Sequence, residues 1–294
     1  MRIAVTGQAG QVVTSLVERG AIAGHDVITV GRPQLDLADP ESVARALAAA
    51  APDAIVSAAA YTAVDRAETE SALAYAVNGA GAGAVAQAAK VLGVPLIHVS
   101  TDYVFDGKLD RPYRETDQTG PTGVYGASKL AGEQAVLSTY GENSAVLRVA
   151  WVYSPFGANF VKTMLRLAGD RDEVSVVADQ VGNPTSALDI ADGILAVVAN
   201  LVSHSDPAMR GTFHMTAQGD ASWADFAEAI FAESGARHGP SALVRPIGTA
   251  DYPTPAMRPA NSRLDCDRIA AVHGIALPAW QGSLATTVAR LHAA

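Results

Sequence analysis

The segment VYGASKLAGEQ, residues 124–134, places Tyr125 four residues before Lys129 in a run whose composition predicts a helix. Residues four apart lie on the same face of a helix. A nearby ammonium favours the phenolate and lowers the pKa of a tyrosine, which suits the phenol to acid/base catalysis. The same lysine would also reach the hydroxyls of a bound ribose. A plainer interpretation is that Tyr125 is partly buried and Lys129 merely extends past it to solvent.

A second candidate is the glycine turn in VTGQAGQ, which follows the first predicted strand and opens the first predicted helix. Gly7 and Gly10 have the spacing of a backbone that turns sharply and approaches a pyrophosphate at a helix N-terminus. Val13 stands where a third glycine would be expected. The alternative is an ordinary strand-to-helix turn, but its place at the start of an α/β chain favours a dinucleotide site.

The end of the second predicted strand bears on the choice of dinucleotide. A site that prefers NAD offers a carboxylate about 20 residues after the glycine turn, to bind the adenosine ribose. This chain has VGRP there, with Arg32 and no carboxylate. Because a guanidinium pairs with a 2′-phosphate, we expect NADPH as cofactor, with NADH also accepted. A solvated loop arginine is the alternative.

Hydroxyl and carboxyl side chains gather at the end of the fourth predicted strand, in HVSTDYVFDG. Ser100, Thr101 and Asp102 stand at a carboxyl end, where open α/β sheets bind their ligands. A hydroxyl there would hydrogen-bond the same carbonyl oxygen that Tyr125 protonates. The glycine turn, the hydroxyl and the tyrosine–lysine pair follow one another in the order that a carbonyl reductase requires.

The elements that position these groups alternate between short apolar runs and longer alanine-rich segments. This alternation predicts an α/β fold, a Rossmann-like doubly wound parallel sheet with a smaller, mostly helical C-terminal substrate-binding region. The predicted strands are 2–7, 26–31, 54–60, 95–101, 145–153, 174–179 and 214–218. The predicted helices are 11–20, 40–50, 72–92, 125–140, 158–169, 189–202, 222–235, 264–273 and 282–292.

Two domains are expected. Residues 1–150 form the NAD(P)-binding domain, whose sheet is completed from about 174–218. Residues 151–294 form the substrate-binding region, which is discontinuous and consists of about 151–173 and 220–294.

Composition narrows the possible functions. The chain has 294 residues, 49% hydrophobic and 17% charged, with a formal net charge of −9. No basic stripe is present to displace counterions, so nucleic acid is not an expected partner. No apolar run approaches the roughly 20 residues that span a bilayer, and the first strand leaves no room for a signal peptide. A single cysteine, Cys266, fits a reducing compartment, and we expect a cytoplasmic protein.

With these motifs in order, the sequence resembles the extended short-chain dehydrogenases/reductases, and within them the dTDP-4-dehydrorhamnose reductase family. The resemblance runs through TGQAGQ, AAAYTAVDRAE, VSTDYVFDG, YGASKLAGE, LRVAWVY, NFVKTML and RPANSRLD. It implies reduction of the 4-keto group of dTDP-4-dehydro-β-L-rhamnose by NAD(P)H, giving dTDP-L-rhamnose for surface polysaccharide.

The resemblance also implies roles for individual residues. Tyr125 would donate the proton, Lys129 would lower its pKa and hold the ribose, and Thr101 would orient the carbonyl. Asp102, Trp151 and Arg258 would bind the substrate, the arginine at the diphosphate. The cofactor would lie against Gly7, Gln8, Gly10, Gln11, Val12, Arg32, Asp36, Leu37, Ala59, Ala60, Tyr61 and Thr62, besides Tyr125 and Lys129.

Some members of the family hold magnesium at a dimer interface through glutamates near the segment that here reads NPTSALDIAD. Leu188 occupies the glutamate position, and helical carboxylates such as Asp189 and Asp192 are usually solvated. We therefore expect no metal, and either a monomer or a homodimer.

Two other functions fit the same fold. One is another dTDP-4-keto-deoxysugar 4-reductase, for example of the dihydrostreptose type, in which only the sugar site differs. The other is a non-catalytic NADP-binding regulatory subunit of the methionine adenosyltransferase β type. Turnover separates the last from a reductase, since a regulator binds cofactor and partner without consuming NAD(P)H.

Overall fold

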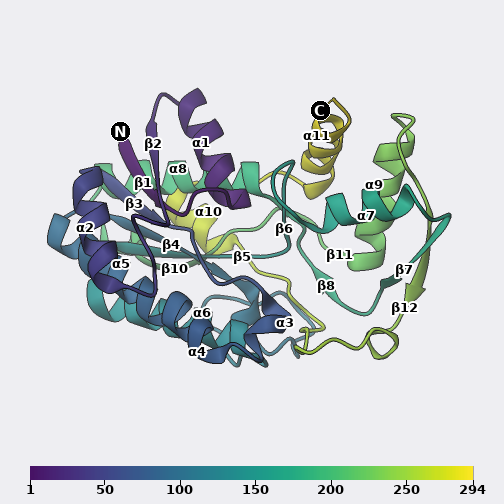
Figure 1. Cartoon of the computed structure of the whole chain (residues 1–294), viewed down its shortest axis with the longest axis horizontal. Helices are drawn as coiled ribbons and strands as arrows, with labels where there is room; N and C mark the ends of the chain where they lie inside the picture. The colour runs from purple at the N-terminus through teal and green to yellow at the C-terminus, as the bar shows by residue number, and fades with distance from the viewer. Residues whose placement is uncertain (294) are drawn as a thin grey trace.

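The computed structural model describes residues 1–293, and its centre is a six-stranded parallel sheet (Figure 1). The strands are β1 (Arg2–Thr6), β2 (Asp26–Val30), β3 (Ala54–Ser57), β4 (Leu96–Thr101), β5 (Ser144–Val149) and β10 (Gly211–His214). Their order in the sheet is β10-β5-β4-β3-β1-β2, and every pairing is parallel. The chain order reverses between β1 and β3, so ligands are expected at the carboxyl ends of these strands.

Helices cover both faces of the sheet, as the continuous apolar strands predict. One face is covered by α2 (Pro40–Ala50), α5 (Gly81–Leu92) and α6 (Val124–Tyr140). The other is covered by α1 (Gln11–Ile22), α8 (Ala187–Ser203) and α10 (Asp267–His273). The predicted doubly wound α/β class is therefore confirmed.

The smaller region lies at the right of Figure 1 and has a core of its own. Its helices are α7 (Phe160–Ala168), α9 (Trp223–Gly235) and α11 (Trp280–Ala293). Beside them, β7 (Glu173–Val177) pairs in parallel with β12 (Leu243–Ile247) as a separate two-stranded sheet.

Three sequence-based expectations are corrected here. The strand expected at 174–179 does not complete the central sheet, because β7 pairs with β12; β10 completes it instead. The helix near 264–273, expected in the substrate region, packs as α10 against β10 and α8 of the large sheet. The strand expected at 145–153 breaks at Trp151, whose φ of 45° is incompatible with an extended chain.

Short elements complete the description. The predicted helix 72–92 comprises α4 (Ser71–Tyr75), a π-helical turn η1 (Ala76–Ala80) and α5. The remaining short segments are α3 (Val64–Ala67), β6 (Val152–Tyr153), β8 (Val181–Gly182), β9 (Thr185–Ser186), β11 (Ala221–Ser222), η2 (Asp102–Val104), η3 (Gly141–Asn143), η4 (Pro207–Met209) and η5 (Thr249–Asp251). Of the helices in residues 1–293, none combines the length and the apolar character needed to cross a membrane.

Candidate active site

The glycine turn lies between β1 and the N-terminus of α1. Gly7 has a φ of +107°, and a Cβ there would lie 3.2 Å from Val13 Cγ2, so only glycine fits without strain. Gly10 is the N-cap residue of α1 and is exposed, and the first backbone N–H groups of the helix follow it. A bare helix N-terminus of this kind suits a pyrophosphate, so the turn fits the phosphates of a dinucleotide.

Val13 does not loosen this turn. Its side chain is 2% exposed and packs into the core between the sheet and α8, on the side where a Cβ at Gly7 would point. The neighbouring Gln11 accepts hydrogen bonds from Ser154 Oγ and Asn159 Nδ2, both at 2.9 Å. The Gln11 side chain therefore connects the turn to the loop after β6. The expected contact of Gln11 with a phosphate then falls to its backbone N–H.

Arg32 lies beside the glycine turn, where the sequence places a 2′-phosphate. Gln8 Nε2 donates to the Arg32 carbonyl oxygen at 2.8 Å, and the Arg32 side chain is exposed. Asp36 is half-buried, but Leu37 is only 7% exposed and packs with α2 and α5. Leu37, expected to lie against the cofactor, is therefore largely a core residue.

The segment after β3 lies next to the turn, at the point where the strand order reverses. Ala59 N donates to Thr6 Oγ1 at 3.0 Å, and Ala59 and Ala60 are half-buried. The Asn78 side chain accepts from Tyr61 N at 2.8 Å and donates to Tyr61 O at 3.0 Å. Thr62 follows and is exposed. Small side chains thus line the surface beside the turn.

Asn78 escaped the sequence-based reasoning although it organises the site. It lies in the π-helical turn η1, is 2% exposed, and also donates to Ser128 Oγ, which donates in turn to the Tyr125 carbonyl oxygen. It thereby fixes the segment after β3 to α6. A polar residue in an otherwise apolar helical run was the available signal, since π-helical turns frequently mark functional sites.

Tyr125 lies on the first turn of α6, whose N-terminus is capped by Glu68 through the backbone N–H of Val124. Burial and the negative charge of Asp102 raise the pKa of Tyr125 to about 12, while the Thr101 side chain acts in the opposite direction. The expectation that Lys129 lowers this pKa is not met in this structure. A phenol with this pKa is protonated at neutral pH, which is the form a proton donor needs.

The physical reason is the direction of the Lys129 side chain. Its ammonium donates to the Val99 carbonyl oxygen at 2.7 Å and lies 3.4 Å from His98 Nε2, so it faces β4. Lys129 is 3% exposed, and burial lowers its pKa to about 8 although Glu133 acts to raise it. The His98 ring is neutral because burial and Lys129 hold its pKa well below the usual value.

Thr101 and Asp102 lie at the carboxyl end of β4, as expected. Thr101 Oγ1 donates to Asp102 Oδ1 at 2.9 Å, whereas Asp102 Oδ2 is buried and, within residues 1–293, has no hydrogen-bond partner. Burial raises the pKa of Asp102 to about 6, with the Ser262 and Thr101 side chains acting to lower it. Thr101 and Asp102 are thus buried, and both act on the half-buried Tyr125.

Trp151 stands where the chain leaves β5, with the positive φ noted above. Its ring stacks on Trp223 of α9, with centroids 3.5 Å apart and an interplanar angle of 6°. A Cβ at residue 182 would lie 2.4 Å from the Trp151 ring, so Gly182 permits this packing. Trp223 was not anticipated from the sequence, because the stack joins distant segments.

Arg258, expected at a substrate diphosphate, forms an ion pair with Asp65 of α3. Its two terminal nitrogens donate to the two carboxylate oxygens at 2.7 and 2.8 Å. The arginine side chain is 22% exposed and the aspartate side chain 40%. The pair is thus open to solvent and accessible to a competing anion.

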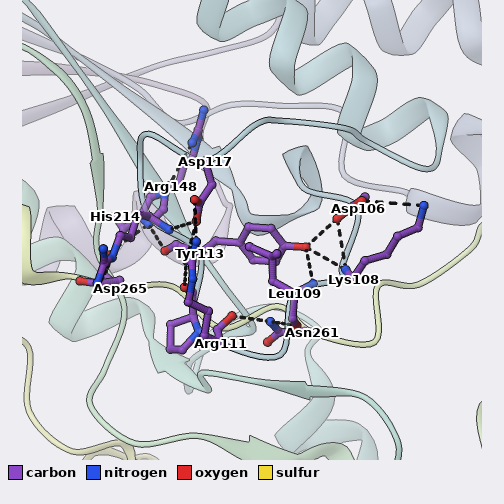
Figure 2. A network of polar contacts seen from close by, with 12 residues as sticks. Asp106, Lys108, Leu109, Arg111, Tyr113, Asp117, Arg148, His214, Asn261 and Asp265 are labelled. Atoms are coloured by element: carbon purple, nitrogen blue, oxygen red, sulfur yellow. Dashed lines mark hydrogen bonds and ion pairs between the residues drawn. The ribbon is translucent and has the colours of Figure 1, made fainter.

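The C-terminal segment that carries Arg258 is tied to the loop after η2. Figure 2 shows Asn261 Nδ2, which donates to the carbonyl oxygens of Leu109 and Arg111, both at 2.8 Å. In the same loop Tyr113 Oη donates to Asp106 Oδ1 at 2.6 Å. These part-buried contacts hold the C-terminal segment against the loop that follows η2.

The carboxylates considered for magnesium have other partners. Arg19 donates through two nitrogens to Asp192, at 2.6 and 2.7 Å, and Ser283 donates to Asp189. Across residues 1–293, no group of three or more His, Cys, Asp or Glu side chains is arranged to hold a metal ion. The expectation that this chain binds no metal stays a prediction.

Comparisons with known proteins identify the family. The family model described as RmlD substrate binding domain matches residues 1–293. The dTDP-4-dehydrorhamnose reductase of Sinorhizobium fredii is 52% identical, over 96% of this chain and 95% of the relative.

Solved structures lead to the same family. A dTDP-4-dehydrorhamnose reductase from Clostridium acetobutylicum superposes with a TM-score of 0.91 at 35% identity, covering 99% of this chain and 100% of the other. The Bacillus anthracis enzyme, solved in complex with NADP, has a TM-score of 0.91 at 34% identity and covers 98% and 99%. The chain therefore belongs to the dTDP-4-dehydrorhamnose reductase family.

Proposed function

We propose that this chain reduces the 4-keto group of dTDP-4-dehydro-β-L-rhamnose, with NADPH as the preferred cofactor, and so forms dTDP-L-rhamnose. The observation that supports the proposal is the contact of the Thr101 side chain with Tyr125 at the carboxyl end of β4, together with Lys129, which donates to Val99 of the same strand. Family membership and the NADP complex of the Bacillus anthracis relative support it.

The cofactor lies along the carboxyl ends of β1 and β3 in this proposal. Gly7, Gly10 and the first turn of α1 hold the pyrophosphate, and Ala59 and Ala60 line the path to the nicotinamide. Arg32 takes the 2′-phosphate, while NADH, which lacks that group, is accepted less well. When bound, NADPH supplies the hydride for the carbonyl carbon.

The side chains supply the proton and the orientation. The Thr101 hydroxyl orients the keto oxygen, and Tyr125 Oη transfers its proton to that oxygen as the hydride reaches the carbon. Carbonyl becomes alcohol and tyrosine becomes phenolate. The Lys129 ammonium, which donates to Val99 O of β4, holds the ribose, and a proton from solvent converts the phenolate back to the phenol. Proton donation of this kind contributes about 10²–10⁴ in rate.

The sugar nucleotide fills the side of the site formed by the smaller region. Trp151, whose ring stacks on Trp223, offers apolar surface to the deoxysugar. Arg258 binds the diphosphate in place of Asp65, because a guanidinium fork suits phosphate as well as carboxylate. Asp102 contacts the sugar beside Thr101.

The test is turnover of dTDP-4-dehydro-L-rhamnose, made in situ from dTDP-glucose by the upstream enzymes. NADPH consumption is followed for the wild type, for Tyr125→Phe and for Tyr140→Phe. Tyr140 is the control, since it is the tyrosine at the opposite end of α6. We expect loss of turnover only in Tyr125→Phe. A wild type that is folded, binds NADPH and leaves this sugar unreduced would overturn the proposal.

The same assay addresses the metal. We propose that reduction needs no magnesium, since Asp189 and Asp192 are engaged with Ser283 and Arg19. EDTA is expected to leave the rate unchanged, and a rate that EDTA abolishes and Mg²⁺ restores would contradict this.

A further inference from the structure

The tyrosine proposed as proton donor has an aromatic neighbour from another part of the chain. Tyr103 lies in η2, two residues after Thr101, and its ring contacts the ring of Tyr125. The ring centroids are 5.5 Å apart and the ring planes are inclined by 76°. Aromatic pairs favour this T-shaped arrangement, because the positive edge of one ring meets the negative face of the other. Both side chains are half-buried, so the contact restricts a phenol that the core does not fully enclose.

The backbone sets how closely these two rings approach. A Cβ at Gly126, the residue after Tyr125, would lie 2.1 Å from the Tyr103 carbonyl oxygen. Only glycine therefore lets α6 come so near to η2. Tyr103 N also donates to Thr101 Oγ1 at 3.2 Å. The Tyr103 backbone thus contacts both the catalytic helix and the hydroxyl proposed to orient the substrate.

The rest of α6 is held against β4 by polar contacts. Lys129 donates to a carbonyl oxygen of β4 at 2.7 Å, and Glu133, which is 2% exposed, accepts from a serine hydroxyl of β4 at 2.5 Å. These contacts lie about one and two helical turns after Tyr125. They fix the helix, and they leave the direction of the Tyr125 side chain to the residues around its ring.

We propose that Tyr103 is a positioning residue, whose ring holds the Tyr125 phenol in place beside Thr101. The inference rests on the proposed role of Tyr125 as proton donor. A phenol that turns freely about its side-chain torsions spends less time within hydrogen-bond reach of a keto oxygen, and the proton transfer slows accordingly. The contact with Tyr125 is made by the ring, so the Tyr103 hydroxyl is not needed for this role.

Two variants separate the ring of Tyr103 from its hydroxyl. Tyr103→Phe keeps the ring, and Tyr103→Leu keeps an apolar side chain without a ring. The control is Tyr140→Leu, which removes an aromatic ring from the opposite end of α6. We expect Tyr103→Leu to lower kcat about 10- to 100-fold, as for a misplaced reacting group, with KM for NADPH nearly unchanged. Tyr103→Phe and Tyr140→Leu should keep nearly the wild-type kcat.

A second measurement needs no substrate. The chain has eight tyrosines, so in protein labelled with ¹³C in the tyrosine rings the Tyr125 signal can be assigned with Tyr125→Phe. NMR relaxation then reports the mobility of that ring. The Tyr125 ring should be more mobile in Tyr103→Leu than in the wild type, and as rigid as in the wild type in Tyr103→Phe and Tyr140→Leu.

Gly126→Ala tests the same contact from the side of the helix, and it serves if Tyr103→Leu does not fold. The added methyl group would collide with the Tyr103 carbonyl oxygen and force α6 away from η2, although both rings are retained. We expect a more mobile Tyr125 ring and a lower kcat in this variant as well.

A Tyr125 ring that stays as rigid as in the wild type when Tyr103 is leucine would overturn the inference. So would a Tyr103→Phe protein that loses as much kcat as Tyr103→Leu, because the hydroxyl and not the ring would then carry the effect. A wild type that does not reduce the sugar would overturn the reductase, whereas an unchanged ring mobility in an active enzyme would overturn only the role of Tyr103.

Discussion

Two ion pairs flank the candidate site, and they differ in exposure. In the pair behind α6 the side chains of Arg148 and Glu133 are 5% and 3% exposed. In the pair at the substrate side those of Arg258 and Asp65 are 22% and 40% exposed. If one partner of the buried pair is lost, water cannot solvate the charge that remains. In the more exposed pair, another anion can take the place of the Asp65 carboxylate. We therefore expect the side with Arg148 to be held rigidly and the proposed substrate side, with Arg258, to be free to rearrange.

The largest effect is expected for Arg148→Met, which leaves the Glu133 carboxylate buried without its cation. Breaking a buried pair in this way lowers the free energy of unfolding by about 3–5 kcal/mol. Arg258→Met, at the more exposed pair, should lower it by about 1 kcal/mol or less. Urea denaturation of both variants measures the contrast. Equal losses would show that the difference in burial has no energetic meaning.

Asp102 extends the comparison of the two ion pairs, because it is a buried carboxylate that takes part in no ion pair within residues 1–293. The pKa of Asp102 is about 6 in the folded protein and lower in the unfolded chain. The folded protein therefore favours the neutral acid over the carboxylate more strongly than the unfolded chain does. Protonated Asp102 makes its full contribution to the free energy of unfolding below the unfolded pKa, near 4. This contribution is lost as pH rises through about 6. Near pH 8 the buried charge then costs about 3 kcal/mol at most.

The variant Asp102→Asn removes this charge. Its stability relative to the wild type should increase as pH is raised from 4 to 8, as measured by thermal unfolding at each pH. Any fixed cost of the amide is the same at both pH values and cancels from the difference. A stability difference that does not change with pH would contradict the raised pKa.

Arg258→Gln tests whether the exposed pair is exchanged for substrate. Loss of a charge-assisted contact to a diphosphate should raise KM for the dTDP-sugar about 10- to 100-fold, with kcat nearly unchanged. Steady-state kinetics at saturating NADPH measure both constants. Arg111→Gln is the control, since that arginine pairs with Asp117 on an exposed loop. An unchanged KM would show that Arg258 has a structural role only.

What the sequence could predict is the part of the structure that depends on local motifs. The alternation of strands and helices is local, so the order of elements and the position of Tyr125, Lys129 and Thr101 follow from short motifs. Partners distant in the chain were not predictable, such as Asp65 for Arg258 and Trp223 for Trp151. Nor was the pairing of β7 with β12, because apolar alternation does not identify the neighbour of a strand.

The direction of the Tyr125 pKa was also beyond the sequence. Spacing places Lys129 on the same helix face, but it does not say where the ammonium points or how far both groups are buried. The structure turns the lysine to Val99 O and gives burial and Asp102 the larger influence on the phenol.

The smallest effect is expected for Arg32, an exposed cation at the cofactor side. Within residues 1–293 its guanidinium takes part in no ion pair, so its removal leaves no partner stranded and should not change stability. Arg32→Ala should raise KM for NADPH about tenfold and leave KM for NADH unchanged, because only NADPH carries the 2′-phosphate. Arg45→Ala, at an exposed arginine on α2, is the control.

Added salt gives a second test of Arg32. Since salt screens an exposed pair of charges, the preference of the wild type for NADPH over NADH should weaken with added salt, whereas the preference of Arg32→Ala should not change. If both cofactors were affected equally, Arg32 would act on the shape of the turn, through its carbonyl bond to Gln8, rather than on the phosphate.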